Sequence, residues 1–587
     1  MPTPVTLEES KWVRYQRLIG QLDLERSAIW SDWRDLNDWL LPTRGRFFLG
    51  STERNRARSR RSKQIIDSTG SLAARTLSSG MMSGITSPAR PWFRLTTPDP
   101  DLAEFASVKQ WLHVVTERMS TVFIRSNVYN KLPLIYQDLG VFGTAAMFVE
   151  ESDRTVIRCS DFPIGSYYLS NDYEGRIGVF AREFQMTVRQ LVKRFGLIEG
   201  TKNIEWSRFS SRVKNAWDLG QGETYIDVAH VIEPNDEYDG ERFGAQFKKF
   251  RACYFERGSP ELNMLLEESG FDEFPVLAPR WEVTGEDAYG TSCPGMIALG
   301  DVKALQTMKK RGLQAVDKKV SPPMVAGTSM KNSPLSILPG GVSYVDESQH
   351  QKFRAAFEVN LDLSDLHQEQ AEVRRLISRS FYEDLFLMLS YGDDQRGSQP
   401  PTAREIDERH EEKLLALGPV LEQLNQDLLD PLIERAFEIM YRRGMIPPAP
   451  PELEGVELKV EYISIMAQAQ KAVGRAAIQD FSAFLIAQVE ATPNDPSILD
   501  VVDRDQMVQE YGDRTGIPPR IVRSDEQVQA IRDKRAQQQE AQRQAEVIAQ
   551  NAKSAKDLAS ADTSGKNALT DIMGNLGGAA PGLARSA

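Results

Sequence analysis

The chain has 587 residues, an apolar content of 41% and a formal net charge of −12 at pH 7. It is too long for a single hydrophobic core, so two to four structural regions are expected. The acidic balance argues against general phosphate neutralisation as the main activity, but leaves DNA open as something that the protein surrounds rather than grips.

Three cysteines (Cys159, Cys253 and Cys293) stand far apart and form no CxxC pair. This usage predicts a reducing compartment and neither a disulfide framework nor a zinc site. The N-terminus has no basic segment followed by an apolar core, and no apolar stretch approaches the roughly 18 residues that span a bilayer. The sequence therefore predicts a soluble protein that is intracellular when it is made.

The first third of the chain is predicted to be helical. Apolar residues recur at helical spacing from Trp12 until Pro42 ends the run, and further helices are expected over 62–85 and roughly 101–139. From about residue 147 the pattern changes to period two with turn residues between, which predicts strands as far as about 285. One short helix, TVRQLVKRFG, interrupts these strands with Thr187 as its N-cap.

The remaining chain is predicted to return to long helices. They cover 294–320, 361–389 and 406–443, and the polar loop YGDDQRGSQPPTARE (391–405) joins the last two. In the first two helices, apolar positions that include Leu313, Val316 and Leu376 are expected to pack helix against helix. A Pro cluster, a short strand ELKVEYIS and further helices follow, the last over about 524–558.

No motif for nucleotide binding or catalysis occurs: GxxxxGK[ST], GxGxxG after a strand, GxSxG and HExxH are all missing, and the five histidines are dispersed. Asp393 and Asp394 with Glu405 offer oxygen ligands for a divalent cation. Adjacent aspartates are also common turn residues, and Thr402 with Glu405 makes a capping box for the next helix, which is the favoured interpretation. We predict no catalytic site, no metal site and no cofactor.

The run RGRFFLGSTERNRARSRRSK (44–63) is the strongest local excess of positive charge. Nucleic-acid contact and docking of this arm on an acidic neighbouring subunit are equally favoured, and a solvated loop is the third possibility. The contact residues would be Arg54, Arg56, Arg58, Arg60 and Arg61. The helices 294–320 and 361–389 carry further cations that are candidates for a stem surface: Lys303, Lys309, Lys310, Arg311, Lys318, Lys319, Arg374, Arg375 and Arg379.

Five stretches, in this order along residues 10–540, resemble the head-to-tail connector (portal) proteins of short-tailed double-stranded DNA phages. They are IIDSTGSLAARTLSSGMMSGITSPARPWFRL, LPLIYQDLGVFGTAAMFVEES, AYGTSCPGMIALGDVKALQTMKKRGLQAVDKKVSPPM, PTAREIDERHEEKLLALGPVLEQLNQDLLDPLIERAFEIMYRRGMIPPAP and YGDRTGIPPRIVRSDEQVQAIRDKRAQQQ. The chain departs from the family pattern at Thr402-Ala403-Arg404-Glu405, where an arginine stands inside the usual T.TE motif, so the local charge there is in doubt.

The resemblance implies a mainly α fold with an α+β wing, assembled as a ring with wing, stem, clip and crown. The implied divisions are a wing at 1–293, stem helices at 294–320 and 361–389, a clip at 321–360, a channel loop at 390–405, a long wing helix and connection at 406–455, C-terminal wing and crown helices at 456–558 and a flexible tail at 559–587. The tip of the channel loop is made by Asp393, Asp394, Gln395, Arg396, Gly397, Ser398 and Gln399.

The resemblance also implies a non-enzymatic function: a dodecameric ring at one capsid vertex of the virion, assembled in the host cytoplasm. Double-stranded DNA passes through it non-specifically, and its protein partners are the terminase, the major capsid protein, the scaffold and tail adaptor proteins. No membrane is involved in the folded ring. The alternatives are a DNA-packaging or processing enzyme, which needs a phosphate loop or metal-binding carboxylates, and a monomeric nucleic-acid-binding scaffold, which needs a basic overall balance.

Overall fold

The computed structural model describes residues 11–45, 65–99, 102, 105–197, 203–242, 244–258, 265–320, 324–325, 354–355, 364–388, 418–456, 458–463, 481–484, 506–507 and 525–560. The chain divides into two compact units, Met1–Val502 and Asp503–Ala587. In the first unit, the secondary structure is a mixture of helices and antiparallel sheets, which confirms that the predicted mainly α fold also contains sheets. Within the described part of the chain, no helix is both long enough and apolar enough to cross a membrane.

The described N-terminal part contains α1 (Lys11–Trp39), α3 (Thr69–Gly84), β1 (Phe93–Thr96), α5 (Ala106–Arg125) and α6 (Val128–Phe142). The helical stretch predicted over roughly 101–139 consists of two helices, because the chain breaks between α5 and α6. At this break the Asn127 side chain bonds both the N–H and the C=O of Cys159, at 2.8 and 2.7 Å. These two side-chain hydrogen bonds fix the turn at Asn127. Helical periodicity in the sequence does not reveal them.

Two antiparallel sheets follow. The smaller has the order β3-β2-β9, with β2 (Ala146–Ser152), β3 (Val156–Phe162) and β9 (Val276–Leu277). The larger has the order β4-β5-β6-β7-β8, with β4 (Tyr167–Asn171), β5 (Ile177–Thr187), β6 (Tyr225–Pro234), β7 (Phe250–Glu256) and β8 (Glu267–Phe271). The strands lie within the region, from about 147 to about 285, in which the period-two pattern predicted them.

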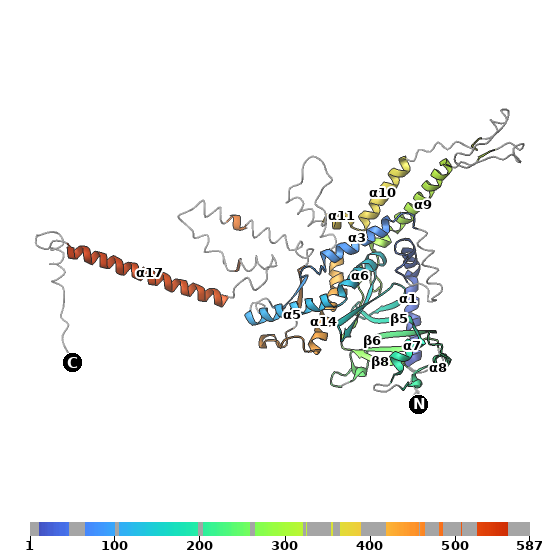
Figure 1. Cartoon of the computed structure of the whole chain (residues 1–587), viewed down its shortest axis with the longest axis horizontal. Helices are drawn as coiled ribbons and strands as arrows, with labels where there is room; N and C mark the ends of the chain where they lie inside the picture. The colour runs from blue at the N-terminus through green and yellow to red at the C-terminus, as the bar shows by residue number, and fades with distance from the viewer. Residues whose placement is uncertain are drawn as a thin grey trace, which may run out of the picture. The chain divides into compact units, whose positions relative to one another are not determined.

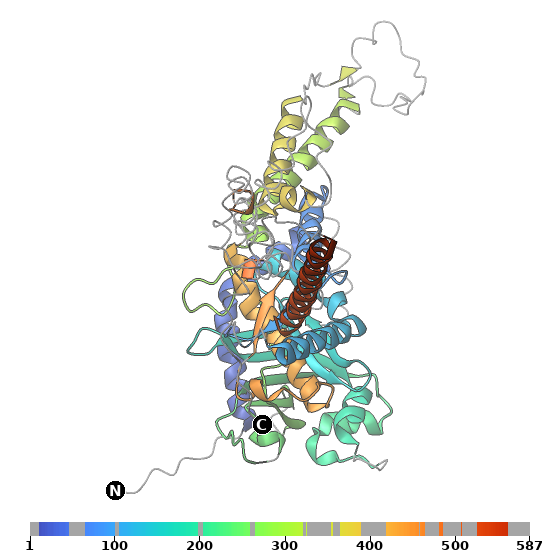
Figure 2. The same cartoon turned by 90° about the vertical axis from the view of Figure 1, so that its left-hand side faces the viewer.

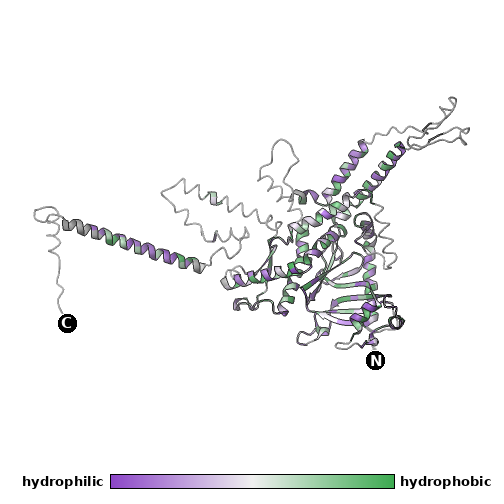
Figure 3. Ribbon diagram, viewed as in Figure 1, coloured by the Kyte–Doolittle hydropathy of each residue, from purple (hydrophilic) through white to green (hydrophobic). Residues whose placement is uncertain are grey.

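The larger sheet is buried on both faces because its residues alternate between two cores. One row of cross-strand partners packs against the helix α1, and it consists of Ala181, Val231 and Cys253. The next row faces the main core, and it consists of Phe180, Ile232 and Ala252. Figure 3 shows the resulting hydrophobic residues along the strands and mainly hydrophilic residues on the helices α10 and α17.

A smaller core covers one end of this sheet. It is built by α7 (Val188–Leu191), the π-helical turn η1 (Val192–Gly196), the 3₁₀ turn η2 (Trp206–Arg208) and α8 (Ser211–Asp218). Thr187 caps α7 as predicted: its side chain accepts from the N–H of Gln190, and the Gln190 side chain accepts from the N–H of Thr187. This reciprocal pair is a capping box, which fixes the start of a very short helix.

A pair of antiparallel helices projects from the body of the first unit. It consists of α9 (Pro294–Val320) and α10 (Ser364–Ser380), and the two views in Figures 1 and 2 show both helices leaving the body side by side. We call this pair the stem pair. The helix predicted over 361–389 is interrupted after Ser380, because Tyr382 has a left-handed φ of 54° and a separate helix, α11 (Glu383–Met388), starts after it. A left-handed backbone at a non-glycine residue ends an α-helix.

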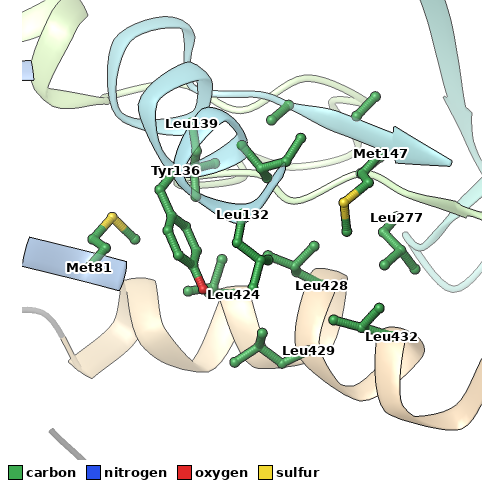
Figure 4. Close-up of a cluster of buried hydrophobic side chains, with 14 of the residues drawn as sticks. Met81, Leu132, Tyr136, Leu139, Met147, Leu277, Leu424, Leu428, Leu429 and Leu432 are labelled. Atoms are coloured by element: carbon green, nitrogen blue, oxygen red, sulfur yellow. The ribbon is translucent and has the colours of Figure 1, made fainter. Parts of the chain in front are cut away.

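The last helical layer of the first unit is one interrupted helix: α13 (Gly418–Leu424), the π-helical turn η6 (Asn425–Leu429) and α14 (Asp430–Arg442). Its buried leucines pack into the main core against Leu132, Tyr136 and Met147, as Figure 4 shows. The chain then makes the 3₁₀ turn η7 (Pro451–Leu453) and β12 (Lys459–Tyr462), which pairs with β1.

Two further pieces complete the described structure. The short 3₁₀ turn η3 (Ala245–Phe247) lies beside β8, and β10 (Met324–Val325) pairs with β11 (Arg354–Ala355) inside the predicted clip, most of which lies outside the described residues. In the second unit, α17 (Asp525–Ser560) confirms the predicted C-terminal helix and runs two residues into the predicted tail.

Candidate channel stem and its anchors

The base of the stem pair is bound to the segment Ile66–Asp67 of the body. The Arg374 guanidinium of α10 lies 2.8 Å from Asp67 Oδ2, and Gln306 of α9 accepts from the N–H groups of Ile66 and Asp67 at 2.8 and 2.9 Å. Gln306 Nε2 also donates to the carbonyl of Asp67 at 2.6 Å. Both stem helices therefore bond to the same short segment that precedes α3.

Burial opposes the ionisation of Asp67, but hydrogen bonds from Thr69 and Arg374 outweigh burial and hold the pKa of this carboxyl below its ordinary value. Asp67 is therefore charged at neutral pH, as its contact with Arg374 requires. Arg374 and Asp67 are 307 residues apart. No local pattern in the sequence signals such a partner.

The structure divides the predicted stem cations into two groups. Lys303 and Arg374 are bound to the body, since Lys303 Nζ lies 2.6 Å from Asp35 Oδ2. Lys309 is half-buried, and the others have exposed side chains: Lys310, Arg311, Lys318, Lys319, Arg375 and Arg379. The apolar residues Leu313, Val316 and Leu376, expected between the helices, are instead 53%, 43% and 44% exposed. The spacing of apolar residues predicts which side of a helix is apolar, but it does not predict which surface covers that side.

The interrupted helix α13–η6–α14 is held to the rest of the first unit by buried arginines. Arg280 Nε and Nη2 donate to the Asp427 carboxylate at 3.0 and 3.2 Å, and the exposed fractions of these two side chains are 3% and 10%. Arg280 also donates to Asn171 Oδ1 and to the carbonyls of Gly175 and Asp287. This arginine therefore joins the helix to the β4–β5 turn and to the segment before α9.

A second buried arginine, Arg435, binds α14 to the same body. Arg435 Nε donates to the carbonyl of Val149 at 2.8 Å, and its Nη1 lies 2.8 Å from Glu273 Oε2. Burial lowers the pKa of Arg435 to about 10, against the opposing charge of Glu273. The guanidinium remains charged at neutral pH, so α14 is fixed to both β2 and the loop before β9.

These anchors were missed by reasoning on the sequence. Arg280 and Asp427 are 147 residues apart, and Arg435 and Glu273 are 162 residues apart. One signal was available: Arg280 is a lone charge in the apolar stretch FPVLAPRW. A charged residue in such a stretch is rarely buried unless it is paired.

Two predicted features lie outside the described residues: the channel-loop tip at 393–399, and the basic arm residues Arg54, Arg56, Arg58, Arg60 and Arg61. The described residues on either side of the arm are both bound to the body. Arg44 makes a two-fold contact with Asp138 at 2.7 and 2.8 Å and reaches Asp161 at 2.8 Å, while Asp67 makes the stem contacts given above. Burial raises the pKa of Asp138 to about 6, although Arg44 opposes that rise.

In the described part of the chain, no group of three or more His, Cys, Asp or Glu side chains is arranged to hold a metal ion. The cysteines Cys159, Cys253 and Cys293 are buried free thiols, and burial raises the pKa of each of them. What the described residues form instead is a projecting helical pair and a set of buried ion pairs that fix it to an α+β body.

Comparison with known proteins identifies the family. Residues 14–522 match the model of the bacteriophage head to tail connecting proteins, and the chain belongs to that family. It is 46% identical over 574 residues to the portal protein of Salmonella phage epsilon15, covering 97% of this chain and 99% of the relative. It is 43% identical over 554 residues to the probable portal protein of Bordetella phage BPP-1, covering 94% of this chain and 96% of that relative.

Among solved structures, the neck of an empty gene transfer agent particle matches with a TM-score of 0.31 and 11% identity, over 74% of this chain and 88% of that chain. A similarity this low supports no conclusion about this chain. The family and the two relatives support a phage portal role, and portal proteins are structural virion components at the connection of head and tail. The resemblance found in the sequence is thereby confirmed.

Proposed function

We propose that this chain forms a closed ring at one capsid vertex, through which the genome is packaged and later ejected, and to which the terminase and then the tail dock. The family membership carries this proposal. The architecture supports it: the stem pair and the helix that follows residues 390–405 are both bound to the wing through buried or half-buried ion pairs. A conduit needs walls that keep their geometry while DNA moves.

The charges of the chain suit passage rather than tight binding. Each phosphate that a lysine or arginine neutralises adds salt-dependent affinity, and a ring multiplies each contact by its symmetry. A net charge of −12 with a few exposed stem cations centres a duplex without holding it. Since the whole genome passes, contacts go to the phosphate backbone and not to base edges.

Within this ring the exposed cations of the stem pair (Lys310, Arg311, Lys318, Lys319, Arg375 and Arg379) are proposed to contribute the DNA-facing charges. Residues 393–399 are proposed to form the constriction, and the basic arm at 44–63 to contact either nucleic acid or a neighbouring subunit. Deleting 392–399 is expected to leave rings that assemble but package or retain DNA poorly. Loss of ring assembly in that deletion contradicts a role confined to the channel.

Native mass spectrometry and electron microscopy of the purified full chain test the proposed function. Twelve copies of a 66.1 kDa chain give a closed particle of roughly 790 kDa. A stable monomer that hydrolyses ATP overturns the portal proposal in favour of a packaging enzyme. A stable monomer that binds nucleic acid without forming rings favours the scaffold alternative.

A further inference from the structure

The stem pair carries two exposed seams. We define the α9 seam as four residues spaced by four, three and four positions: Lys309, Leu313, Val316 and Val320. We define the α10 seam as four residues with the same spacing: Asp365, Glu369, Glu372 and Leu376. Positions i, i+4, i+7 and i+11 lie on one face of an α-helix, so each set forms one continuous stripe.

The two seams differ in chemistry. In the α9 seam, three apolar side chains with exposed fractions of 53%, 43% and 76% follow one lysine. In the α10 seam, three exposed carboxylates precede one leucine. An exposed apolar stripe on a two-helix projection indicates a surface that another protein covers. The acidic α10 seam complements the lysine at the base of the α9 seam.

Contacts within the stem pair fix the level of each residue along it. A side chain at Gly312 would lie against Leu366 and Gln370 of α10. Six residues lower on α9, Gln306 bonds to Asp67, to which Arg374 of α10 also bonds. The helices are therefore antiparallel, and Lys309, midway between 306 and 312, is level with the stretch 369–372 of α10.

The two seams point to opposite sides of the stem pair. Successive helical residues rotate by about 100°, so the α9 seam is centred about 70° from the direction of Gly312, which faces α10. The α10 seam is centred about 130° from the direction of Gln370, which faces α9. Since the helices are antiparallel, the rotation from Gly312 to the α9 seam and the rotation from Gln370 to the α10 seam have the same sense when viewed along the stem. Gly312 and Gln370 point toward each other, in opposite directions. The two seams therefore face opposite sides of the stem pair.

We propose that the α9 seam of one copy binds the α10 seam of the next copy in the ring, with Lys309 facing Glu369 and Glu372 of that neighbour. A contact between two different patches on opposite sides of a subunit is heterologous, which is the kind that closes a ring when its rotation allows. The inference rests on the proposed function. It assigns Lys309 to the contact between subunits, whereas the exposed stem cations remain the proposed residues of the channel surface.

Charge reversal in the full chain tests this contact. Lys309→Glu alone, and Glu369→Lys together with Glu372→Lys, each place like charges together, and each is expected to lower the fraction of chains in rings about tenfold at matched protein and salt concentration. The variant that combines all three changes restores opposite charges and is expected to recover rings. Native mass spectrometry measures the ring fraction, and circular dichroism melting verifies that the subunits of each variant remain folded.

Lys310→Glu is the matched control, because it makes the same charge change one residue along and about 100° further round the helix. It is expected to form rings like the wild type. The contact is overturned, while the portal proposal stands, if wild-type rings form but the variant with all three changes is as deficient as the two partial variants, or if the control loses rings equally. A wild-type chain that remains monomeric overturns the portal proposal itself.

Discussion

Replacing Arg280 with methionine tests whether its ion pair fixes the interrupted helix to the wing. The change removes the guanidinium and leaves the Asp427 carboxylate 10% exposed, with Gln423 Nε2 at 2.9 Å as its remaining described partner. Breaking a buried ion pair by removing one member costs about 3–5 kcal/mol, because the other charge stays buried without compensation. We expect Arg280→Met to destabilise the first unit by that amount.

The reverse change, Asp427→Asn, is expected to cost less. Arg280 retains Asn171 and the carbonyls of Gly175 and Asp287 as acceptors, so its guanidinium is not left uncompensated. Removing both charges in Arg280→Met with Asp427→Leu is expected to recover most of the loss, since two apolar side chains of similar volume fill the same space.

Urea unfolding of the full chain, followed by tryptophan fluorescence, measures these differences in free energy. The matched control is Arg176→Met, because Arg176 pairs with Glu174 at 3.9 Å with its side chain 82% exposed. An exposed pair of this kind contributes about 0–1 kcal/mol. A cost below about 1 kcal/mol for Arg280→Met, no larger than that of the control, refutes the anchoring role.

Three further predictions concern the core and one buried carboxylate. Leu428→Ala, at a fully buried position of η6, is expected to cost about 2–5 kcal/mol in urea unfolding, whereas equal costs for it and for the 73% exposed Leu219→Ala contradict the packing in Figure 4. Gly80→Ala places a methyl group on the buried Phe386 ring, so we expect a loss of about 1–3 kcal/mol and faster hydrogen exchange in α11; unchanged exchange argues against this close approach. Asp138 has a pKa raised by burial to about 6, above its unfolded value, so the stability it contributes is lost as pH rises through 6. The melting temperature of the wild type relative to Asp138→Asn should therefore rise between pH 7.5 and pH 5, and a flat difference refutes the shift.

Much of the secondary structure could be predicted because it depends on residues that are close in the sequence. Helical spacing located α1, α9 and α17, and strand alternation located four of the five strands of the larger sheet, β4 to β7. The capping box at Thr187 was predictable for the same reason: both its partners lie within four residues. Breaks such as Tyr382 were not, because a left-handed residue there depends on what surrounds it and carries no glycine or proline signal.

The anchors of the candidate site could not be predicted, since each joins segments that are distant in the sequence. Charge counts identified the stem cations as a set, but only the fold shows that Lys303 and Arg374 are bound to the body. In the same way, periodicity marked Leu313 and Val316 as apolar positions without showing that they face outward. The sequence indicates which charged or apolar residues need a partner. Only the tertiary structure shows whether that partner lies in the same chain.

The interruption in the last long helix has a cause in the sequence, and it explains where the anchor falls. Pro431 has no N–H to donate to the carbonyl of Asp427, and its ring would clash with that carbonyl in a regular α-helix. The chain responds with the wider turn η6, in which the N–H of Asp430 reaches the carbonyl of Asn425. Leu428 and Leu429, adjacent in sequence, are both fully buried in this turn, while Asp427 meets Arg280.

The position of that turn matters for the proposed conduit. Asp427 and Arg435 are eight residues apart, or about 12 Å along the helix, and each is held by a different part of the wing. A displacement that enters from the channel-loop side of residue 418 meets the Arg280–Asp427 pair before it reaches the rest of the buried stretch in α14. The π-helical turn η6 interrupts the regular helix at the same place, so we expect bending to concentrate where the ion pair resists it and α14 to keep its packing.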